Sequence, residues 1–403
     1  MSIPRRPPAM NLPKDSPEHP AGITERLVRC VDSVRYAELP GEAVAVSKVI
    51  LLDGLANMLA GSTEPLGRIL ASYVAAMGGA PTATVIGTPL KTNPPFAAFA
   101  NAAFCHSMDY EAMWWPPTHP TSPVLPALLS LAEQEGLPGT KVIEALVAGF
   151  EVQGRLNIAV DWIADPYAYF HPPGTIGVIG SAAASAKLLG LDPWKIRMAV
   201  GIAASRTGGL WANTGTMTKS QHSANSARSG VECALLARAG YTSCEEIIES
   251  PKGGFGRLIF GEEADLEAAV RNFGKPFRMV DPGITIKKFP AQTTTHWGID
   301  AALEIKNRHN PKADEIQKVV VRVGAPNWSA HWPKPRSGLE GKFSIHYTVA
   351  LALLDGGLSI DSFTDERRFS PDLEPLLEKI TVIEDPTIPP GLDFAKTWAT
   401  VAV

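Results

Sequence analysis

The sequence predicts a mainly α-helical protein in which a large all-helical domain is followed by a smaller α+β domain. Apolar residues recur at helical spacing almost without interruption from residue 23 to about residue 274. After Pro282 the pattern changes to short β-branched runs mixed with helices, and 403 residues suffice for two or three domains. We therefore assign residues 23–278 to the helical domain and 279–403 to the α+β domain, and we expect the Pro-rich residues 1–22 to be a disordered leader.

The helices of the first domain are predicted from apolar spacing and from their ends. Ser122-Pro123 marks one start, and Gly190 marks one end. Ala- and Gly-rich stretches such as GVIGSAAASAKLLG let helices approach closely, which predicts a compact bundle. Only residues 82–87 have the pattern of a strand in this region. The predicted helices span residues 23–38, 42–60, 64–77, 95–109, 123–135, 139–160, 174–190, 193–207, 222–239 and 263–271.

The second domain combines strands and helices. Residues 316–323 read IQKVVVRV, a β-branched run with partial alternation, and residues 379–382 and 398–403 are similar. Residues 293–306 and 343–354 have helical spacing. Because the sequence ends inside a predicted strand, we expect either a terminal edge strand or a polypeptide that is shorter than its fold.

The composition excludes several classes of protein. With 45% hydrophobic residues, 19% charged residues and a formal net charge of -4, the chain lacks the basic excess of a nucleic-acid-binding protein. No run approaches the roughly 18 uninterrupted apolar residues of a membrane span, and the N-terminus lacks a signal-peptide core. The cysteines lack CxxC spacing, which indicates a reducing compartment. We predict a cytoplasmic protein that binds neither nucleic acid nor a membrane.

The stretch CHSMDYEAMWWPPTHPTSPVLPALLSLAE, residues 105–133, is the first candidate for a functional site. Helices usually end before a proline, so residues 114–126 are expected to be mostly irregular chain between two helices, which is a common form of pocket wall. Within this stretch, Asp109 and His119 can serve as acid, base or orienting pair. The alternative is a turn aspartate and a loop histidine, which is the commoner outcome for such a pair taken alone.

Four further patches gather groups that can hold an anion or transfer a proton. His171 precedes a helix start marked by two prolines, and Lys219 lies among hydroxyl residues in GTMTKSQH. Paired lysines precede His296 in KKFPAQTTTHW, and FSIHY opens a hydrophobic helix. The alternatives are close helix packing for the glycines after His171, an exposed loop for Lys219, and core packing for FSIHY.

Several known motifs are absent from the sequence. GxGxxG, GxxxxGK[ST], HExxH and GxSxG do not occur in the required contexts, which disfavours nucleotide binding, zinc catalysis and serine hydrolysis. The remaining polar groups suit proton transfer on an anionic substrate, so we predict neither a cofactor nor a metal.

Taken in order, these motifs resemble the MmgE/PrpD family. The resemblance covers roughly residues 25–400 and implies an α+β lid over the helical domain, an active site between them, and a homodimer. It also implies a cofactor-independent lyase that acts on a small di- or tricarboxylic acid. WPPTHP, FHPP and KKFPAQTTTHW are closest to the branch that decarboxylates cis-aconitate, while dehydration and epimerisation through a similar carbanion stay open. The motifs are HSMDYEAMWWPPTHPTSPVLPALLSLAE, FHPPGTIGVIGSAAASAKLLGL, TMTKSQHSANSARSGVECALLA, KKFPAQTTTHWGIDAALEI and FSIHYTVALALLDGGL.

The resemblance also assigns site residues. It implies that Lys219, His171 and His296 bind carboxylates, and that Asp109 orients His119 or acts with it in proton transfer. The expected catalytic residues are Asp109, His119, His171, Lys219, His296 and Tyr347, and the expected substrate-binding residues are Lys288, Thr295 and Gln221.

The sequence departs from the family pattern at two places in these motifs. Glu111 is the only acid in YEAM, where the family often has a second and a third acid after the first aspartate. Ser220 and Gln221 stand where Pro-Leu is usual in the decarboxylases. The family also has a C-terminal segment that returns to the helical domain, and this sequence ends at Val403 before such a segment. The missing acids and the early end favour a second hypothesis, a catalytically silent homologue that holds a carboxylate.

Overall fold

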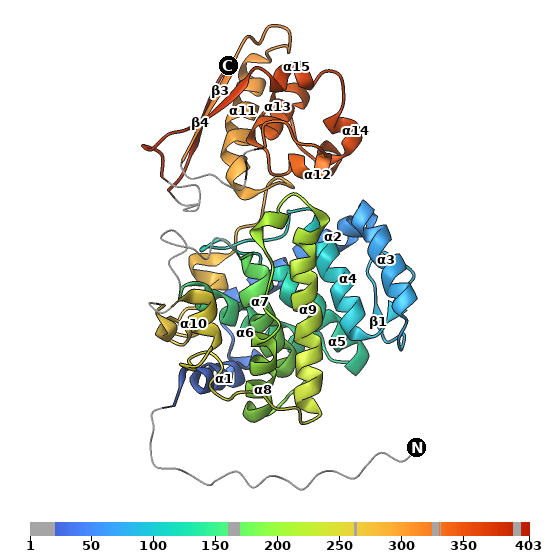
Figure 1. The fold of residues 1–403 in the computed structure, drawn as a ribbon, viewed down its shortest axis with the longest axis vertical. Helices are drawn as coiled ribbons and strands as arrows, with labels where there is room; N and C mark the ends of the chain where they lie inside the picture. Colours follow the sequence, from blue (N-terminus) through green and yellow to red (C-terminus); the bar gives the residue numbers. More distant parts are fainter. Residues whose placement is uncertain (1–20, 160–169, 262–263, 325–329, 331, 390–395) are drawn as a thin grey trace.

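The computed structural model describes residues 21–159, 170–261, 264–324, 330, 332–389 and 396–403. Nearly all of the predicted leader, residues 1–22, therefore lies outside the described residues. Figure 1 shows two parts stacked along the long axis, with the helices from α1 to α10 below and the mixed part from α11 to the C-terminus above. The prediction of a mainly α-helical fold with a smaller α+β part is confirmed.

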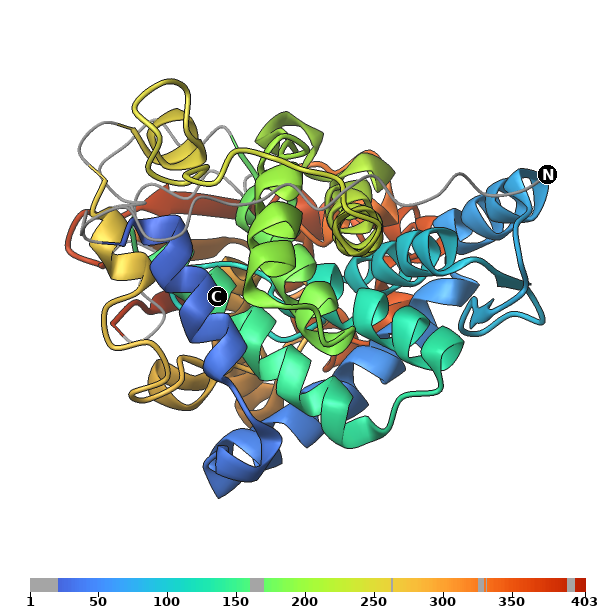
Figure 2. The ribbon, with the colours of Figure 1, turned by 90° about the horizontal axis from the view of Figure 1, so that it is seen from below.

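The lower part is a bundle of helices around one continuous hydrophobic cluster, which runs from Ile23 to Met279. In the view from below, the green helices lie at the centre of this part (Figure 2). The helices are α1 (Ile23–Ser33), α2 (Gly41–Thr63), α3 (Pro65–Met77), α4 (Pro94–Ser107), α5 (Thr121–Glu135), α6 (Gly139–Asn157), α7 (Pro172–Leu188), α8 (Pro193–Ala204), α9 (Met217–Arg238) and α10 (Phe255–Phe260).

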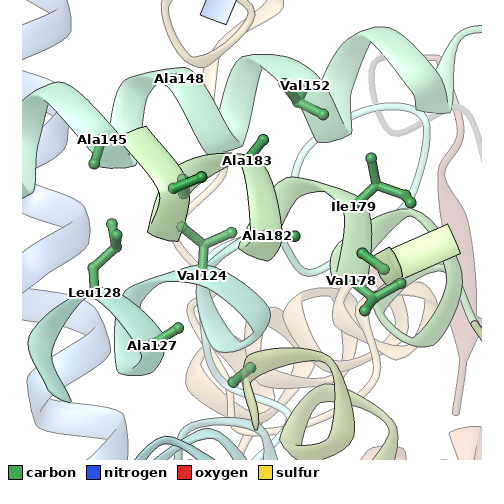
Figure 3. Packing of buried hydrophobic residues seen from close by; sticks show 14 of the residues in the cluster. Val124, Ala127, Leu128, Ala145, Ala148, Val152, Val178, Ile179, Ala182 and Ala183 are labelled. Carbon is green, nitrogen blue, oxygen red and sulfur yellow. The ribbon is translucent and has the colours of Figure 1, made fainter. Parts of the chain in front are cut away.

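Small residues set the spacing of the central helices. Every residue of α7 is buried, and the helix packs against both α6 and α9. A Cβ atom on Gly180 of α7 would lie 2.8 Å from the carbonyl oxygen of Gly149 in α6, and one on Gly230 of α9 would lie 2.5 Å from Cβ of Ser181. Valine, leucine and alanine side chains of α5, α6 and α7 fill the space between these close contacts (Figure 3).

The upper part contains a three-stranded sheet in the order β4-β3-β5. The central strand β3 (Val319–Val323) pairs in parallel with β4 (Ile380–Glu384) and antiparallel with β5 (Ala399–Ala402), which is an edge strand. A second hydrophobic cluster, from Phe289 to Ile380, joins this sheet to its helices. The helices are α11 (His296–His309), α12 (Gly338–Gly341), α13 (Ile345–Asp355), α14 (Asp365–Arg368) and α15 (Glu374–Leu377).

Three predicted elements of the helical region were wrong in kind or extent. The strand expected at residues 82–87 is only the two-residue β1 (Ala83–Thr84), which pairs with β2 (Lys91–Thr92) in a small hairpin. The helix expected at 263–271 is, within the described residues, a short 3₁₀ helix at Leu266–Ala269. The helical start expected near Pro123 lies at Thr121, because proline lacks only an N–H that the first turn does not use.

The start of α9 was also predicted too late, and this matters for the site. The sequence analysis placed it at residue 222, but the helix begins at Met217 with the side chain of Thr216 accepting a hydrogen bond from the N–H of Thr218. Polar residues hid the start, because they interrupt the apolar spacing although Lys219 and Ser220 are buried. Lys219 therefore lies in the first turn of a helix rather than on a loop.

Helix α2 carries an unusual amount of exposed apolar surface. It is the one described helix that is long and apolar enough to cross a membrane. Of the 18-residue stretch that meets this criterion, 33% is buried inside the protein. The sequence analysis expected no membrane span because it required uninterrupted apolar residues, and Lys48 and Asp53 interrupt this helix. Leu52 is 72% exposed on this helix, and Ile69 is 56% exposed on the neighbouring α3. A single such helix is weak evidence for a membrane span.

Candidate active site

Asp109 lies directly after α4, in a buried polar cluster at the junction of the two parts. Its backbone adopts the left-handed conformation, with φ of 49°, which aspartate tolerates but which still costs on the order of 1 kcal/mol. Nζ of Lys219 donates a hydrogen bond to Oδ2 of Asp109 at 2.6 Å. Nζ of Lys287 donates to Oδ1 and, at 2.7 Å, to the backbone carbonyl oxygen of Asp109. These contacts hold the strained conformation in place.

The two lysines determine the charge of Asp109. Burial by itself would raise the pKa of this carboxyl group, but the ammonium groups of Lys219 and Lys287 hold the pKa well below its ordinary value. Burial lowers the pKa of Lys287, and the Asp109 carboxylate opposes that effect. Asp109 is therefore a carboxylate at neutral pH, which suits an orienting anion better than a proton donor.

Three histidines surround this ion-paired centre. The ring centroids of His106 and His119 are 4.7 Å apart, and those of His106 and His171 are 5.2 Å apart. Burial, reinforced by the nearby ammonium groups of Lys219 or Lys287, holds the pKa of each imidazole well below its ordinary value. The three rings are therefore neutral at neutral pH, and each carries one N–H.

Two ring nitrogens of this cluster are buried without a hydrogen-bond partner among the described residues. They are Nδ1 of His119 and Nε2 of His171. His171 uses its other ring nitrogen, because its Nδ1 lies 3.1 Å from Nδ1 of His222 and one of the two must donate to the other. Since buried polar atoms are nearly always hydrogen-bonded, the two unpaired nitrogens are the natural contacts for a ligand.

Glu111 is a second buried carboxyl group, two residues after Asp109. Its Oε2 accepts a hydrogen bond from the backbone N–H of Ser122 at 2.7 Å, and its Oε1 lies 2.5 Å from Nδ1 of His106. Burial raises the pKa of Glu111 to about 8, although the hydrogen bonds from Ser122 oppose the increase. The two carboxyl groups thus differ in charge near neutral pH because only Asp109 contacts an ammonium group.

The upper part contributes directly to the cluster. Lys287 comes from the segment that connects the two parts, and the ring of Phe343 lies 5.1 Å from Nζ of Lys219. Nζ of the buried Lys342 donates to the carbonyl oxygens of Met108 and Pro290, both at 3.3 Å. Burial lowers the pKa of Lys342 to about 8. The site therefore depends on both parts of the chain.

The predicted site residues divide into two groups. Asp109, His119, His171 and Lys219 lie together in the cluster. His296 lies at its margin, where Nε2 contacts the carbonyl oxygen of Ala291 at 3.2 Å and burial lowers the pKa to about 4.

The other predicted residues make their contacts elsewhere. The hydroxyl group of Tyr347 donates to the carbonyl oxygen of Ser362 at 2.6 Å, and its ring packs near Phe363. Lys288 is exposed and pairs with Asp300 at 2.6 Å. Gln221 is exposed, and Oγ1 of the buried Thr295 donates to the carbonyl oxygen of Gln292. Catalytic or substrate-binding roles for these residues stay predictions.

The sequence analysis missed several members of the cluster. His106, Glu111 and His222 lay inside quoted motifs without an assigned role, and Lys342 was not considered. Lys288 was selected instead of Lys287, although adjacent residues of an extended chain point in opposite directions and only Lys287 is buried. A useful signal was the spacing of Lys219 and His222, which are three residues apart and therefore share one helix face.

One group of side chains among the described residues has the spacing of a metal site. His106, Glu111 and His119 offer ligand atoms that lie within 4.8 Å of one another. However, Nδ1 of His106 is already paired with Glu111, and Nζ of Lys219 lies 3.1 Å from Nε2 of the same ring. A second ammonium group, that of Lys287, adds to the repulsion of a dication, so we interpret the group as a hydrogen-bonded network.

Comparison with known proteins places the chain in a family. The model of the MmgE/PrpD N-terminal domain matches residues 25–267, and the model of the MmgE/PrpD C-terminal domain matches residues 289–403. The chain belongs to the MmgE/PrpD family. The gap between the two matches contains Lys287, which joins the two parts at Asp109.

Individual relatives in this family narrow the class of enzyme. Human cis-aconitate decarboxylase is 33% identical over 385 residues, which cover 92% of this chain and 79% of the relative. Cis-aconitate decarboxylase of Aspergillus terreus is 27% identical over 389 residues, which cover 90% and 78%. The 2-methylcitrate dehydratase of Escherichia coli is 26% identical over 392 residues, which cover 89% and 77%. Decarboxylases and dehydratases are both lyases, and this member of the MmgE/PrpD family is a lyase as well.

Proposed function

We propose that this chain is a cofactor-independent lyase that acts on a small di- or tricarboxylic acid, with decarboxylation of cis-aconitate as the leading candidate reaction. The observation that carries the proposal is the convergence of buried ammonium groups with neutral imidazoles that have unpaired nitrogens. Lys219, Lys287 and Lys342 outnumber the one carboxylate, Asp109, so the site has an excess of positive charge. Such a site suits a substrate with several carboxylates.

In the proposed decarboxylation, the bond between a carboxylate carbon and its neighbour breaks and CO2 leaves. The electron pair stays on the neighbouring carbon and is delocalised into the rest of the substrate, where fixed ammonium groups stabilise it. A proton then forms the new C–H bond. His119 and Lys219 are the proposed donors, since a bound anionic substrate favours the protonated form of a neighbouring imidazole.

Dehydration is the second candidate reaction, and the resemblance to 2-methylcitrate dehydratases supports it. It requires a base that removes a proton next to a carboxylate and an acid that protonates the leaving hydroxyl group. Epimerisation requires proton transfer on both faces of one carbon. Because all of these reactions pass through similar carbanions, the same histidines and lysines support each of them.

Proton NMR in D2O tests the proposal with the full chain and with cis-aconitate, 2-methylcitrate and iminodisuccinate in turn. Formation of itaconate that is lost in His119→Ala supports the decarboxylase. Loss of water from 2-methylcitrate, or deuterium exchange next to a carboxylate, supports the alternative reactions. Activity should survive dialysis against EDTA, and activity that returns only with added metal would contradict cofactor independence. Binding without turnover of any of the three acids would favour a silent carboxylate-binding homologue.

A homodimer is the second part of the proposal. Val49, Leu52, Leu55 and Leu59 recur along one face of α2, and three further exposed apolar residues extend the surface onto α3. Monomeric proteins rarely expose large apolar patches, so we propose that a second copy of the chain covers this surface. The residues on α3 are Ile69, Tyr73 and Met77.

Light scattering coupled to size exclusion tests the dimer. The wild-type chain should elute with twice the monomer mass, and Leu52→Glu should elute as a monomer with an unchanged circular dichroism spectrum. Leu258→Glu is a matched control, because Leu258 is 70% exposed on α10, away from this surface. A wild-type monomer that sediments with phospholipid vesicles would contradict the proposal and assign α2 to a membrane surface.

A cytoplasmic location is also proposed. Cys30, Cys105, Cys233 and Cys244 are all free thiols, as expected in a reducing compartment. Cell fractionation checks this location, and recovery of the chain from a secreted or membrane fraction would overturn it.

A further inference from the structure

Glu111 has no role in the proposed reaction, although it is completely buried beside the reacting groups. Each of its oxygens has a defined neighbour. Oε2 accepts the hydrogen bond from Ser122, while Oε1 faces Nδ1 of His106 at 2.5 Å and Nδ1 of His119 at 3.6 Å. A buried carboxyl group that is aimed at two imidazoles rather than at a cation calls for an explanation.

His106 connects Glu111 to Lys219. Its Nδ1 contacts Glu111, and its Nε2 lies 3.1 Å from Nζ of Lys219. A neutral imidazole donates with one nitrogen and accepts with the other, so the protonation of one neighbour is linked to that of the other. Burial and the ammonium group of Lys219 hold the pKa of His106 well below its ordinary value, so the ring is neutral and carries a single N–H.

Two patterns satisfy every hydrogen bond in this chain of groups. In the first, the Lys219 ammonium donates to Nε2, and the Nδ1–H of His106 donates to the Glu111 carboxylate. In the second, Glu111 is a carboxylic acid that donates to Nδ1, and the Nε2–H donates to a neutral Lys219 amine. The patterns differ by transfer of one proton from Lys219 to Nε2 and of one from Nδ1 to Glu111, with no change in total charge.

We propose that Glu111 and His106 are positioning residues that set the protonation state of Lys219 by passing a proton through the His106 ring. The carboxylate form of Glu111 supports the Lys219 ammonium, which can bind a carboxylate or donate a proton. The acid form supports the amine, which can accept a proton from carbon. This inference rests on the proposed lyase function for its catalytic meaning, but the coupling of the three groups does not depend on any substrate.

Other titratable groups surround the proton relay formed by Glu111, His106 and Lys219. Asp53 of α2 approaches through its hydrogen bond from the N–H of Ala112, and Cys105 of α4 lies 3.8 Å from Oε2 of Glu111. Because these groups are unchanged by a substitution at Glu111, they affect the wild-type chain and the variant alike. The facing groups are Asp53, Cys105, Asp109, His119, His171 and Lys287.

Glu111→Gln gives a directional test. The amide oxygen takes the hydrogen bond from Ser122, so the amide NH2 group must donate to Nδ1 of His106. This places the ring proton on Nε2, facing Lys219, and disfavours the ammonium form. Nitrogen NMR of the chain with ¹⁵N-labelled histidine should show the Nδ1–H tautomer of His106 in the wild type above about pH 8 and the Nε2–H tautomer in the variant. His106→Asn assigns the signal.

The second readout is the pH dependence of kcat/KM. If the Lys219 ammonium is the active form, activity should rise as pH rises through about 8, where Glu111 becomes a carboxylate. Glu111→Gln cannot ionise and should lack this rise. Glu111→Asp should restore the rise, and Glu144→Gln, at a buried glutamate outside the site, should leave it unchanged.

The two readouts separate the failure of this inference from the failure of the proposed function. The same His106 tautomer in the wild type and in Glu111→Gln overturns the relay, whatever the enzyme does. Lower activity with an unmoved pH profile also overturns it and assigns Glu111 a structural role. A changed tautomer in a chain that converts none of the three acids supports the relay and counts against the proposed substrates.

Discussion

The two halves of the site contrast sharply, although their carboxyl groups are only two residues apart in the sequence. Around Asp109, Lys219 and Lys287 supply two ammonium groups, and the pKa of the carboxyl group is held well below its ordinary value. Around Glu111, the neighbours are a backbone N–H and an imidazole, and burial raises the pKa to about 8. Both side chains are buried, so the neighbouring charge, rather than burial, decides which carboxyl group is ionised.

The largest effect is expected when the ion pairs of Asp109 with Lys219 and Lys287 are removed. Asp109→Ala leaves two buried ammonium groups without their counterion, which should lower the free energy of unfolding by about 3–5 kcal/mol. Urea denaturation measures this change. Asp300→Ala is the control, because it removes a comparable but exposed ion pair with Lys288 and should cost at most about 1 kcal/mol. Equal losses in the two variants would show that the buried pairs carry no special stability.

The next effect concerns the histidine that faces both carboxyl groups. His119→Ala should lower kcat by about 10²–10⁴-fold if the imidazole transfers a proton, with little loss of stability. Tyr347→Phe is the matched comparison, because it removes a hydroxyl group bonded to Ser362 and should leave the rate nearly unchanged. Steady-state kinetics measure both variants. A larger rate loss in Tyr347→Phe would instead support the catalytic role that family resemblance implies for Tyr347.

A smaller effect should appear in the pH dependence of stability. The pKa of Glu111 is raised in the folded state, so its contribution is present at low pH and is lost as pH rises from about 4.5 toward about 8. The slope is at most about 1.4 kcal/mol per pH unit for one group. Urea denaturation at pH 6 and pH 8 should therefore show a larger loss of stability in the wild type than in Glu111→Gln. Parallel losses would mean that Glu111 is ionised throughout this range.

Asp109 contributes with the opposite sign. Its pKa is depressed in the folded state, so its stabilisation is present above the unfolded-state pKa and disappears only as pH falls through the folded-state value. The difference between Glu111→Gln and the wild type at pH 6 and pH 8 is therefore independent of Asp109. The same series of measurements therefore distinguishes the contribution of Glu111 to stability from that of Asp109.

The smallest effect is expected at Lys288, next to the buried Lys287. Lys288→Ala removes an exposed ion pair with Asp300 and should change the free energy of unfolding by less than about 1 kcal/mol, with kcat/KM nearly constant. Thermal denaturation and kinetics check this result. A large increase in KM would show that Lys288 does more than form a surface ion pair, and it would support the predicted contact with the substrate.

Sequence patterns were sufficient for most of the helical architecture. The helices predicted at 95–109, 139–160 and 174–190 correspond to α4, α6 and α7, because long apolar runs bounded by proline or glycine have few other solutions. The start of α9 escaped detection because its first turns contain polar residues. Lys219 lies in that segment and donates to Oδ2 of Asp109, a contact that only the packed structure provides.

Part of the site was also predicted from local sequence patterns. Asp109, His119 and His171 stand in conspicuous polar motifs between helices, Lys219 stands in another at the start of α9, and the structure gathers the four residues. The sequence did not distinguish Lys287 from Lys288, because both have the same chemistry and only the direction of the side chain differs.

The sequence by itself determined the helical class, the mixed C-terminal part and the segments that supply the polar groups of the site. These features depend on local periodicity and on residue type. Only the tertiary structure decided that Asp109 is ionised while the pKa of Glu111 is raised to about 8, and that His106 joins Glu111 to Lys219. The charge state of a carboxyl group depends on its burial and on its distances to charged groups from other segments. Those distances are set only when α4, α9 and the connecting segment pack together.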